Sequence, residues 1–96
     1  MITENKVERT IDETVLETVR SREDETIEYY LYRGRKDGRD SFSIQAIQYK
    51  RGVKICQATA CDVSSVCSHA AEIFDAVSRG FVEPYVLCDV VYDLLP

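Results

Sequence analysis

The chain has 96 residues, of which 45% are hydrophobic and 30% charged, and its net charge is −5 at pH 7. This length allows one domain with a thin core, and the composition is that of ordinary globular proteins. No apolar run approaches the roughly 18 residues that cross a membrane. The polar N-terminus, MITENKVERT, does not have the pattern of a signal peptide. We therefore expect a cytoplasmic protein whose four cysteines are reduced.

The charge is spread unevenly along the chain. Residues 1–28 carry nine acids and four bases, residues 33–54 carry seven bases and two acids, and residues 55–96 carry six acids and one base. An acidic protein is a poor non-specific binder of nucleic acid, so nucleic-acid binding is disfavoured. The basic middle leaves a local anion site open.

The sequence does not show whether residues 1–12 are ordered. A flexible segment is one interpretation, and a helix is another. Val7, Ile11 and Val15 have helical spacing. β-branched residues dominate residues 13–20, so we favour a strand there.

Residues 26–34 and 41–49 are predicted strands, and Asp37-Gly38 between them is typical of a two-residue hairpin turn. This turn fixes the register of the two strands. The predicted pairs on one face are Arg33–Phe42, Leu31–Ile44, Tyr29–Ala46 and Ile27–Gln48. Those on the other face are Tyr32–Ser43, Tyr30–Gln45, Glu28–Ile47 and Thr26–Tyr49.

The next hairpin turns at Lys50-Arg51-Gly52, where two registers compete. A two-residue turn at Arg51-Gly52 would scatter apolar residues over both faces. A three-residue loop with Gly52 left-handed makes both faces coherent, and we choose it. The predicted pairs are then Ala46–Cys56, Ile44–Ala58, Phe42–Ala60, Ile47–Ile55 and Tyr49–Val53.

Residues 65–79 are predicted to form a helix with Ser65 as its N-cap and Gly80 as its C′ residue. Its apolar stripe consists of Val66, Ala70, Ile73, Phe74 and Val77. The small side chains of the last strand, Cys56, Ala58 and Ala60, would let this helix lie close to the sheet.

After an extended connection over 81–86, apolar spacing predicts a second short helix over 87–95. The expected fold is α+β. It consists of an antiparallel three- to four-stranded β-meander over residues 13–60 followed by two C-terminal helices, the first packed on one face of the sheet.

Four stretches carry a resemblance to a known family. They are the strand EYYLYRG, the turn YKRG, the helix start DVSS and the ending VEPYVLCDVVYDLL. Together they resemble a family of short uncharacterised proteins, a domain of unknown function, from anaerobic Gram-positive bacteria. The resemblance covers roughly residues 14–95. It implies a fold and brings no activity, cofactor or site residue with it.

Cys61, Cys67 and His69 are the first candidate site, for a metal or for thiol chemistry. Cys67 and His69 are two residues apart, so their side chains diverge by roughly 160° on a helix. No C-x2-C pair is present, and the acids nearby would raise a thiol pKa. We therefore assign no metal ligand, no cofactor and no catalytic residue, and expect a protein that is not an enzyme.

A second candidate is a weak anion site at the first hairpin turn, formed by Arg33, Arg35, Lys36 and Arg39. A second basic cluster, at Lys50, Arg51 and Lys54, would lie at the opposite end of an antiparallel sheet. The two clusters therefore form no common groove, and a solvated turn explains each of them.

The third candidate is the sheet face that one helix cannot cover. It carries Tyr30, Tyr32, Ile47, Tyr49, Val53 and Ile55. The N-terminal segment, the last helix or another chain must cover it, or it stays exposed. Tyrosine-rich apolar patches often mark interfaces.

The sequence thus favours a small cytoplasmic, non-catalytic interaction module that binds a protein partner or a second copy of itself, as a homodimer. It indicates no small-molecule substrate and no membrane binding. The metal or thiol site and anion or nucleic-acid binding at the basic turns remain as alternatives.

Overall fold

The structure, a computed structural model, describes residues 13–95, so the expectations for residues 1–12 lie outside it. Four strands precede two α-helices and one short 3-10 helix. The strands are β1 Glu13–Arg22, β2 Glu25–Lys36, β3 Arg39–Lys50 and β4 Val53–Ser64. The helices are α1 Cys67–Arg79, η1 Pro84–Val86 and α2 Leu87–Leu94.

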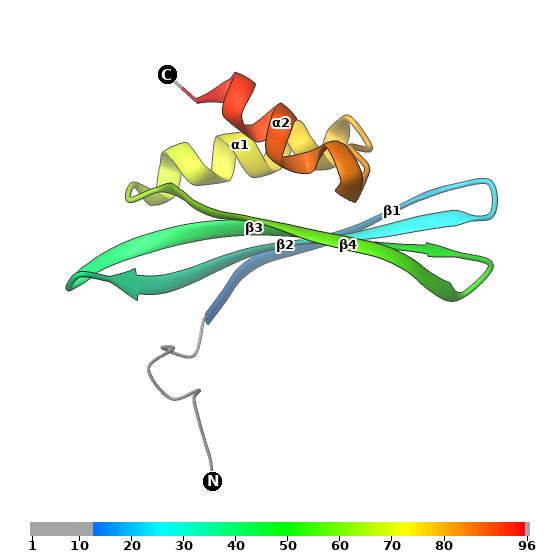
Figure 1. Cartoon of the computed structure of the whole chain (residues 1–96), viewed down its shortest axis with the longest axis horizontal. Helices are drawn as coiled ribbons and strands as arrows, with labels where there is room; N and C mark the ends of the chain where they lie inside the picture. The colour runs from blue at the N-terminus through cyan, green and yellow to red at the C-terminus, as the bar shows by residue number, and fades with distance from the viewer. Residues whose placement is uncertain (1–12, 96) are drawn as a thin grey trace, which may run out of the picture.

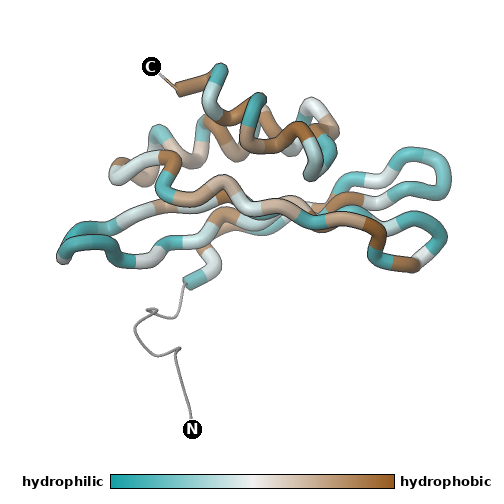
Figure 2. The backbone as a smooth tube through the Cα atoms, viewed as in Figure 1, coloured by the Kyte–Doolittle hydropathy of each residue, from teal (hydrophilic) through white to brown (hydrophobic). Residues whose placement is uncertain are grey.

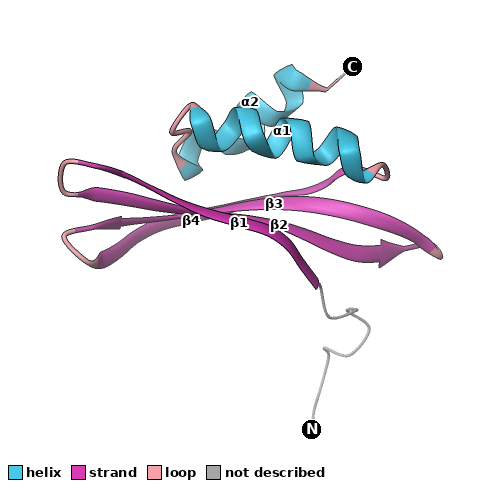
Figure 3. Ribbon diagram, turned by 180° about the vertical axis from the view of Figure 1, so that it is seen from behind, coloured by secondary structure: helices cyan, strands magenta, loops and turns pink. Residues whose placement is uncertain are grey.

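The strands form one antiparallel sheet in the order β1-β2-β3-β4, and both α-helices lie on the same face of it (Figure 1). The view from behind shows the same two layers (Figure 3). The predicted α+β meander with two C-terminal helices is confirmed, with all four strands present.

The turn between β2 and β3 has the conformation that its sequence predicts. Asp37 and Gly38 have φ values of 54° and 79°, as a two-residue hairpin turn of this kind requires. All eight predicted pairs between β2 and β3 are confirmed, including Leu31 with Ile44 and Tyr30 with Gln45. This end of the sheet is hydrophilic (Figure 2).

The turn between β3 and β4 differs from the prediction. Lys50 pairs with Val53, so Arg51 and Gly52 form a two-residue turn with φ values of 51° and 80°. The predicted three-residue loop is therefore wrong, as are the pairs that depended on it. A bulge at Ile55 follows, where the register shifts between Tyr49–Lys54 and Gln48–Cys56. The extra residue returns the alternating side chains to the predicted faces.

A second irregularity lets β4 continue past the predicted end of the meander at residue 60. Ile44 pairs with Ala60, whereas Phe42 pairs with Ser64, so β4 has extra residues here. Asp62 lies within this segment and is left-handed, with φ of 55°. The strand then continues to Ser64, directly before the first helix.

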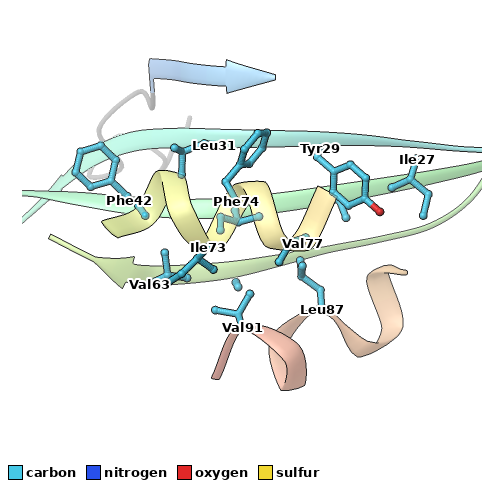
Figure 4. Close-up of a cluster of buried hydrophobic side chains, with 14 residues drawn as sticks. Ile27, Tyr29, Leu31, Phe42, Val63, Ile73, Phe74, Val77, Leu87 and Val91 are labelled. Carbon is cyan, nitrogen blue, oxygen red and sulfur yellow. The ribbon is translucent and has the colours of Figure 1, made fainter. Parts of the chain in front are cut away.

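The core lies between the sheet and the two helices (Figure 4). The sheet contributes Ile27, Tyr29, Leu31, Phe42, Ile44, Ala46, Ala60 and Val63. The helices contribute Ala70, Ile73, Phe74, Val77, Leu87 and Val91. The predicted packing of the first helix on this face is confirmed, with the small Ala46 and Ala60 buried beneath the helical layer. Val66, predicted in the helix stripe, is instead 54% exposed because the helix begins after it.

The ends of α1 correct two predictions. Val66 is the N-cap and no side chain caps it; Ser65 is not the cap. The N–H of Val66 instead donates to Oγ of Ser64 (2.9 Å), in a turn that precedes the helix.

Gly80 is the C-cap, with an ordinary φ of −80°, and the left-handed C′ residue is Phe81. The N–H groups of Phe81 and Val82 donate to the carbonyls of Ser78 and Val77 (both 3.2 Å). These two bonds form a Schellman motif. The guanidinium of Arg22 lies 4.3 Å from the Phe81 ring centroid, a cation–π contact that holds the ring in place.

The connection after α1 was predicted to be extended over residues 81–86, but its last three residues form a 3-10 helix. Pro84 starts the 3-10 helix η1, a position where its fixed φ and missing N–H are favourable. The second helix, Leu87–Leu94, agrees with the predicted 87–95 to within one residue.

Candidate functional site

The tyrosine face, which we define by Tyr30, Tyr32, Ile47 and Tyr49, is the surface of β2 and β3 opposite the helices. These side chains alternate along their strands with the buried core residues, and all four are half-buried. No helix or strand within residues 13–95 packs over this face (Figures 1 and 3). The last helix, one of the covers considered from the sequence, lies on the opposite face of the sheet, where it contacts β4, α1 and η1.

Hydrogen bonds between side chains fix the hydroxyl groups of the three tyrosines. The hydroxyls of Tyr30 and Tyr49 both donate to Oε1 of Glu28, at 2.9 and 3.3 Å. The Tyr32 hydroxyl donates to Oε1 of Gln45 at 2.9 Å. The rings of Tyr30 and Tyr32 stack with their centroids 5.7 Å apart and their planes 15° apart. The face is therefore pre-organised, with its aromatic side chains in fixed orientations.

The carboxylate of Glu28 also changes how these tyrosines titrate. The hydrogen bond to Glu28, then burial and the negative charge of Glu28, raise the pKa of Tyr30 to about 12. Burial and the charge of Glu28 raise the pKa of Tyr49 as well. Both hydroxyls consequently remain protonated donors at any physiological pH.

Two of the six predicted face residues change place with the corrected register. Tyr49 lies opposite Lys54, and Ile47 lies opposite Gln57, so the predicted pairs Tyr49–Val53 and Ile47–Ile55 are wrong. Val53 pairs with Lys50 at the tip of the hairpin and is 64% exposed, and Ile55 is the bulge residue, 53% exposed. Both apolar side chains remain accessible. The residues of β4 that lie beside the tyrosine face are polar, namely Lys54 and Gln57.

Sequence reasoning placed Glu28 and Gln45 on this face without giving them a role. Their positions follow from strand alternation, but their hydrogen bonds depend on side-chain reach between strands. The amide of Gln45 donates to Oγ1 of Thr59 (3.3 Å), which joins β4 to the network. A tyrosine with a polar residue diagonally across the hairpin is the signal that could have found these contacts.

The basic turn between β2 and β3 is matched by acids. Arg33 pairs with Glu13, Arg35 with Asp40 (3.4 Å) and Lys36 with Asp62 (3.1 Å). An open hollow of about 440 Å³ lies beside this turn. It is lined by Lys36, Asp37, Arg39, Asp40, Ser41, Asp62, Ser64 and Ser65. Its three aspartates outnumber its two bases, so the hollow is a poor site for an anion.

Asp62, which lines this hollow, has a left-handed backbone conformation, and its hydrogen bonds stabilise that conformation. Its carboxylate accepts hydrogen bonds from Ser41 and Lys36, which lower its pKa, and its N–H donates to Oγ of Ser43 (3.1 Å). These contacts fix the second irregularity of β4 against β3.

Asp62→Gly is expected to be more stable than Asp62→Ala by about 0.5 to 1 kcal/mol. Both variants lose the carboxylate, but the left-handed φ of 55° strains alanine and not glycine. Urea denaturation of the two variants measures the difference. An alanine variant as stable as the glycine variant would contradict the left-handed conformation of this residue.

The cysteines and the histidine do not converge. Cys61 and Cys67 are exposed, Cys56 and Cys88 are half-buried, and all four are free thiols. The Nδ1 atom of His69 lies 3.4 Å from Oγ of Ser64. Residues 13–95 contain no group of three or more His, Cys, Asp and Glu side chains placed to hold a metal ion.

Comparisons with protein-family models, with curated proteins and with solved structures give no match. The resemblance drawn from the sequence motifs therefore stays a prediction. Within the described part of the chain, no helix is long and apolar enough to cross a membrane.

Proposed function

We propose that this protein is a small, non-catalytic interaction module whose tyrosine face binds a protein partner or a second copy of the chain. The observation that carries the proposal is the placement of both helices on the opposite face, which leaves the tyrosine face without a covering helix or strand among residues 13–95 (Figure 3).

The size of the sheet suits this role. Its strands have 10 to 12 residues. Four such strands cover roughly 600 to 800 Å² at the usual strand spacing and rise. One partner contributes about 800 Å² to a standard protein–protein interface.

The chemistry of the face supports the same proposal. Tyrosine is enriched at interfaces because it has a large apolar ring, a polar end and few rotatable bonds. Here the ring orientations are fixed before binding by the contacts to Glu28 and Gln45. A partner that docks on this face would therefore have little side-chain entropy to remove.

The first experiment asks whether the face is open in the free protein. A soluble gadolinium chelate should broaden the NMR signals of the Tyr30 and Tyr49 rings in the monomer, and leave the buried Tyr29 ring sharp. Protection of Tyr30 and Tyr49 to the extent of Tyr29 would mean that the chain covers its own face, and the proposal would fail.

The second experiment compares two pairs of tyrosines. Tyr32→Ser with Tyr49→Ser is expected to weaken association at least about tenfold, because two interface aromatics are lost. Tyr85→Ser with Tyr92→Ser is the matched control, since these residues lie in the helical layer and are 75% and 64% exposed. Sedimentation velocity over a range of concentrations measures self-association, and circular dichroism checks the fold. A larger effect of the control pair would assign the interface to the helices.

A further inference from the structure

The two edges of the sheet are not equally suited to strand pairing. Among the described strands, β1 and β4 are the outermost. β4 is interrupted by the bulge at Ile55 and by the irregularity that contains Asp62, and α2 packs against it. The thiol of Cys88 in α2 also donates to the carbonyl of Thr59 in this strand (3.7 Å). Bulges and a covering helix are usual means of blocking an edge strand, so β4 is a poor site for pairing.

The other edge, β1, keeps a regular segment. The register shift of β1 lies between Thr14 and Leu16, and the next seven residues, Leu16–Arg22, pair with β2 without interruption. All of them except Thr18 are exposed. Val19, at the centre of the segment, has 59% of its surface exposed. A regular edge with an exposed apolar centre is a template for pairing with another strand.

The turn between β1 and β2 decides which backbone groups of this segment point outward. Arg22 pairs with Glu25 across a two-residue turn, and the closing pair of such a hairpin exchanges its backbone hydrogen bonds. In an antiparallel pair, bonded positions alternate with positions whose N–H and C=O groups point away. The backbone groups of Glu17, Val19 and Ser21 therefore point away from β2.

We propose that two copies of the chain pair along β1, antiparallel and centred on Val19, so that their four-stranded sheets join into one. The two-fold axis is perpendicular to the sheet, as for any two neighbouring antiparallel strands that symmetry relates. Both tyrosine faces then lie on the same side of the joined sheet. The opposite pairs are Val19–Val19, Glu17–Ser21, Thr18–Arg20 and Leu16–Arg22. This inference uses the edge of the sheet and does not rest on the proposed function.

The symmetry of the segment favours a second copy over an unrelated strand. Val19 is the middle residue of Leu16–Arg22, so this register lets all seven residues pair and leaves the irregularity of β1 outside the interface. The outward backbone groups of Glu17 meet those of Ser21, and the outward groups of Val19 meet each other. None of the opposite pairs joins like charges, which would destabilise the pairing.

The neighbouring registers lack these properties. A centre at Arg20 would place the two Arg20 guanidinium groups opposite each other, and a centre at Glu17 would do the same with two carboxylates. A centre at Thr18 would bring the irregularity at Val15 opposite Ser21. The charges and the register shift together select the centre that we propose.

Sedimentation velocity of the full chain at concentrations up to about 1 mM should show a reversible dimer, because one paired strand makes an interface below the standard size. Val19→Lys places two ammonium groups opposite each other and removes an apolar contact. It is expected to weaken the dimer at least about tenfold. Val53→Lys is the matched control, since Val53 is 64% exposed on the opposite edge strand. It should leave the affinity within about twofold. Circular dichroism checks the fold of both variants.

Amide hydrogen exchange tests which groups pair. The amides of Glu17, Val19 and Ser21 should exchange more slowly as the protein concentration rises, by about tenfold once about nine-tenths of the chain is dimeric. The amides of Thr18 and Arg20 bond to β2 in the monomer and should show the smaller change.

Three results would overturn the inference: a chain that stays monomeric at about 1 mM, equal losses in the two lysine variants, or slowed exchange confined to other strands. If Tyr32→Ser with Tyr49→Ser abolishes the dimer and Val19→Lys does not, self-association uses the tyrosine face, and the proposed function stands without the pairing of β1. If Val19→Lys alone abolishes the dimer while the gadolinium chelate fails to reach Tyr30 in the monomer, the pairing stands and the proposed function fails.

Discussion

Replacing Leu87 with alanine is expected to lower the free energy of unfolding by about 2 to 5 kcal/mol. Leu87 is the first residue of α2 and has no exposed surface. With Val91 it anchors this helix in the core between α1 and β4 (Figure 4). Truncation removes apolar contacts and leaves a cavity, whereas alanine itself favours the helix. The loss is a large part of the roughly 5 to 15 kcal/mol of a typical domain.

Leu94→Ala is the matched control, because Leu94 ends the same helix and is 43% exposed. It should lower the free energy of unfolding by less than about 1 kcal/mol. Urea denaturation measures both variants, and unchanged m values would show that the same transition is compared. Equal effects of the two substitutions would mean that α2 is not anchored in the core as the structure places it.

The sequence predicts the faces of this sheet better than its pairing, for a physical reason. Alternation of apolar side chains is set by burial, and Ile27, Tyr29 and Leu31 show it clearly. Register depends on single turn and bulge residues. Asp37-Gly38 is an unambiguous turn, and its register is confirmed. Arg51 and Asp62 are left-handed without being glycine, so composition alone does not reveal the irregularities they belong to.

The candidate site shows the same division. Tyr30, Tyr32, Ile47 and Tyr49 share one face, as alternation predicts. Val53 was misplaced because the turn has two residues and not three, so that Lys54 and not Val53 lies opposite Tyr49. The role of Glu28 could not be predicted, because it requires the hydroxyls of Tyr30 and Tyr49 to reach one oxygen from two strands.

Stability is expected to fall above pH 10, with Tyr29 as a principal cause. Burial, and then the negative charge of Glu83, raise the pKa of Tyr29, and its hydroxyl donates to the carbonyl of Val82 (2.8 Å). Below the ordinary tyrosine pKa of about 10, both folded and unfolded chains keep the proton, and the contribution is complete. Above it the unfolded chain releases the proton and the folded chain does not. The contribution is therefore lost as pH rises from 10 through the raised pKa, by up to about 1.4 kcal/mol per pH unit.

Tyr29→Phe separates this effect from the other alkaline titrations. At pH 8 the variant should be about 1 kcal/mol less stable, because the Val82 carbonyl loses its donor. Between pH 8 and pH 11.5 it should lose about 2 kcal/mol less than the parent protein, since phenylalanine has no proton to release. Tyr30 and Tyr49, whose pKa values are also raised, titrate in both proteins and cancel in the comparison. Urea denaturation across this range gives both curves. Parallel curves would show that Tyr29 ionises as readily in the folded chain as in the unfolded one, which is incompatible with a buried hydroxyl bonded to Val82.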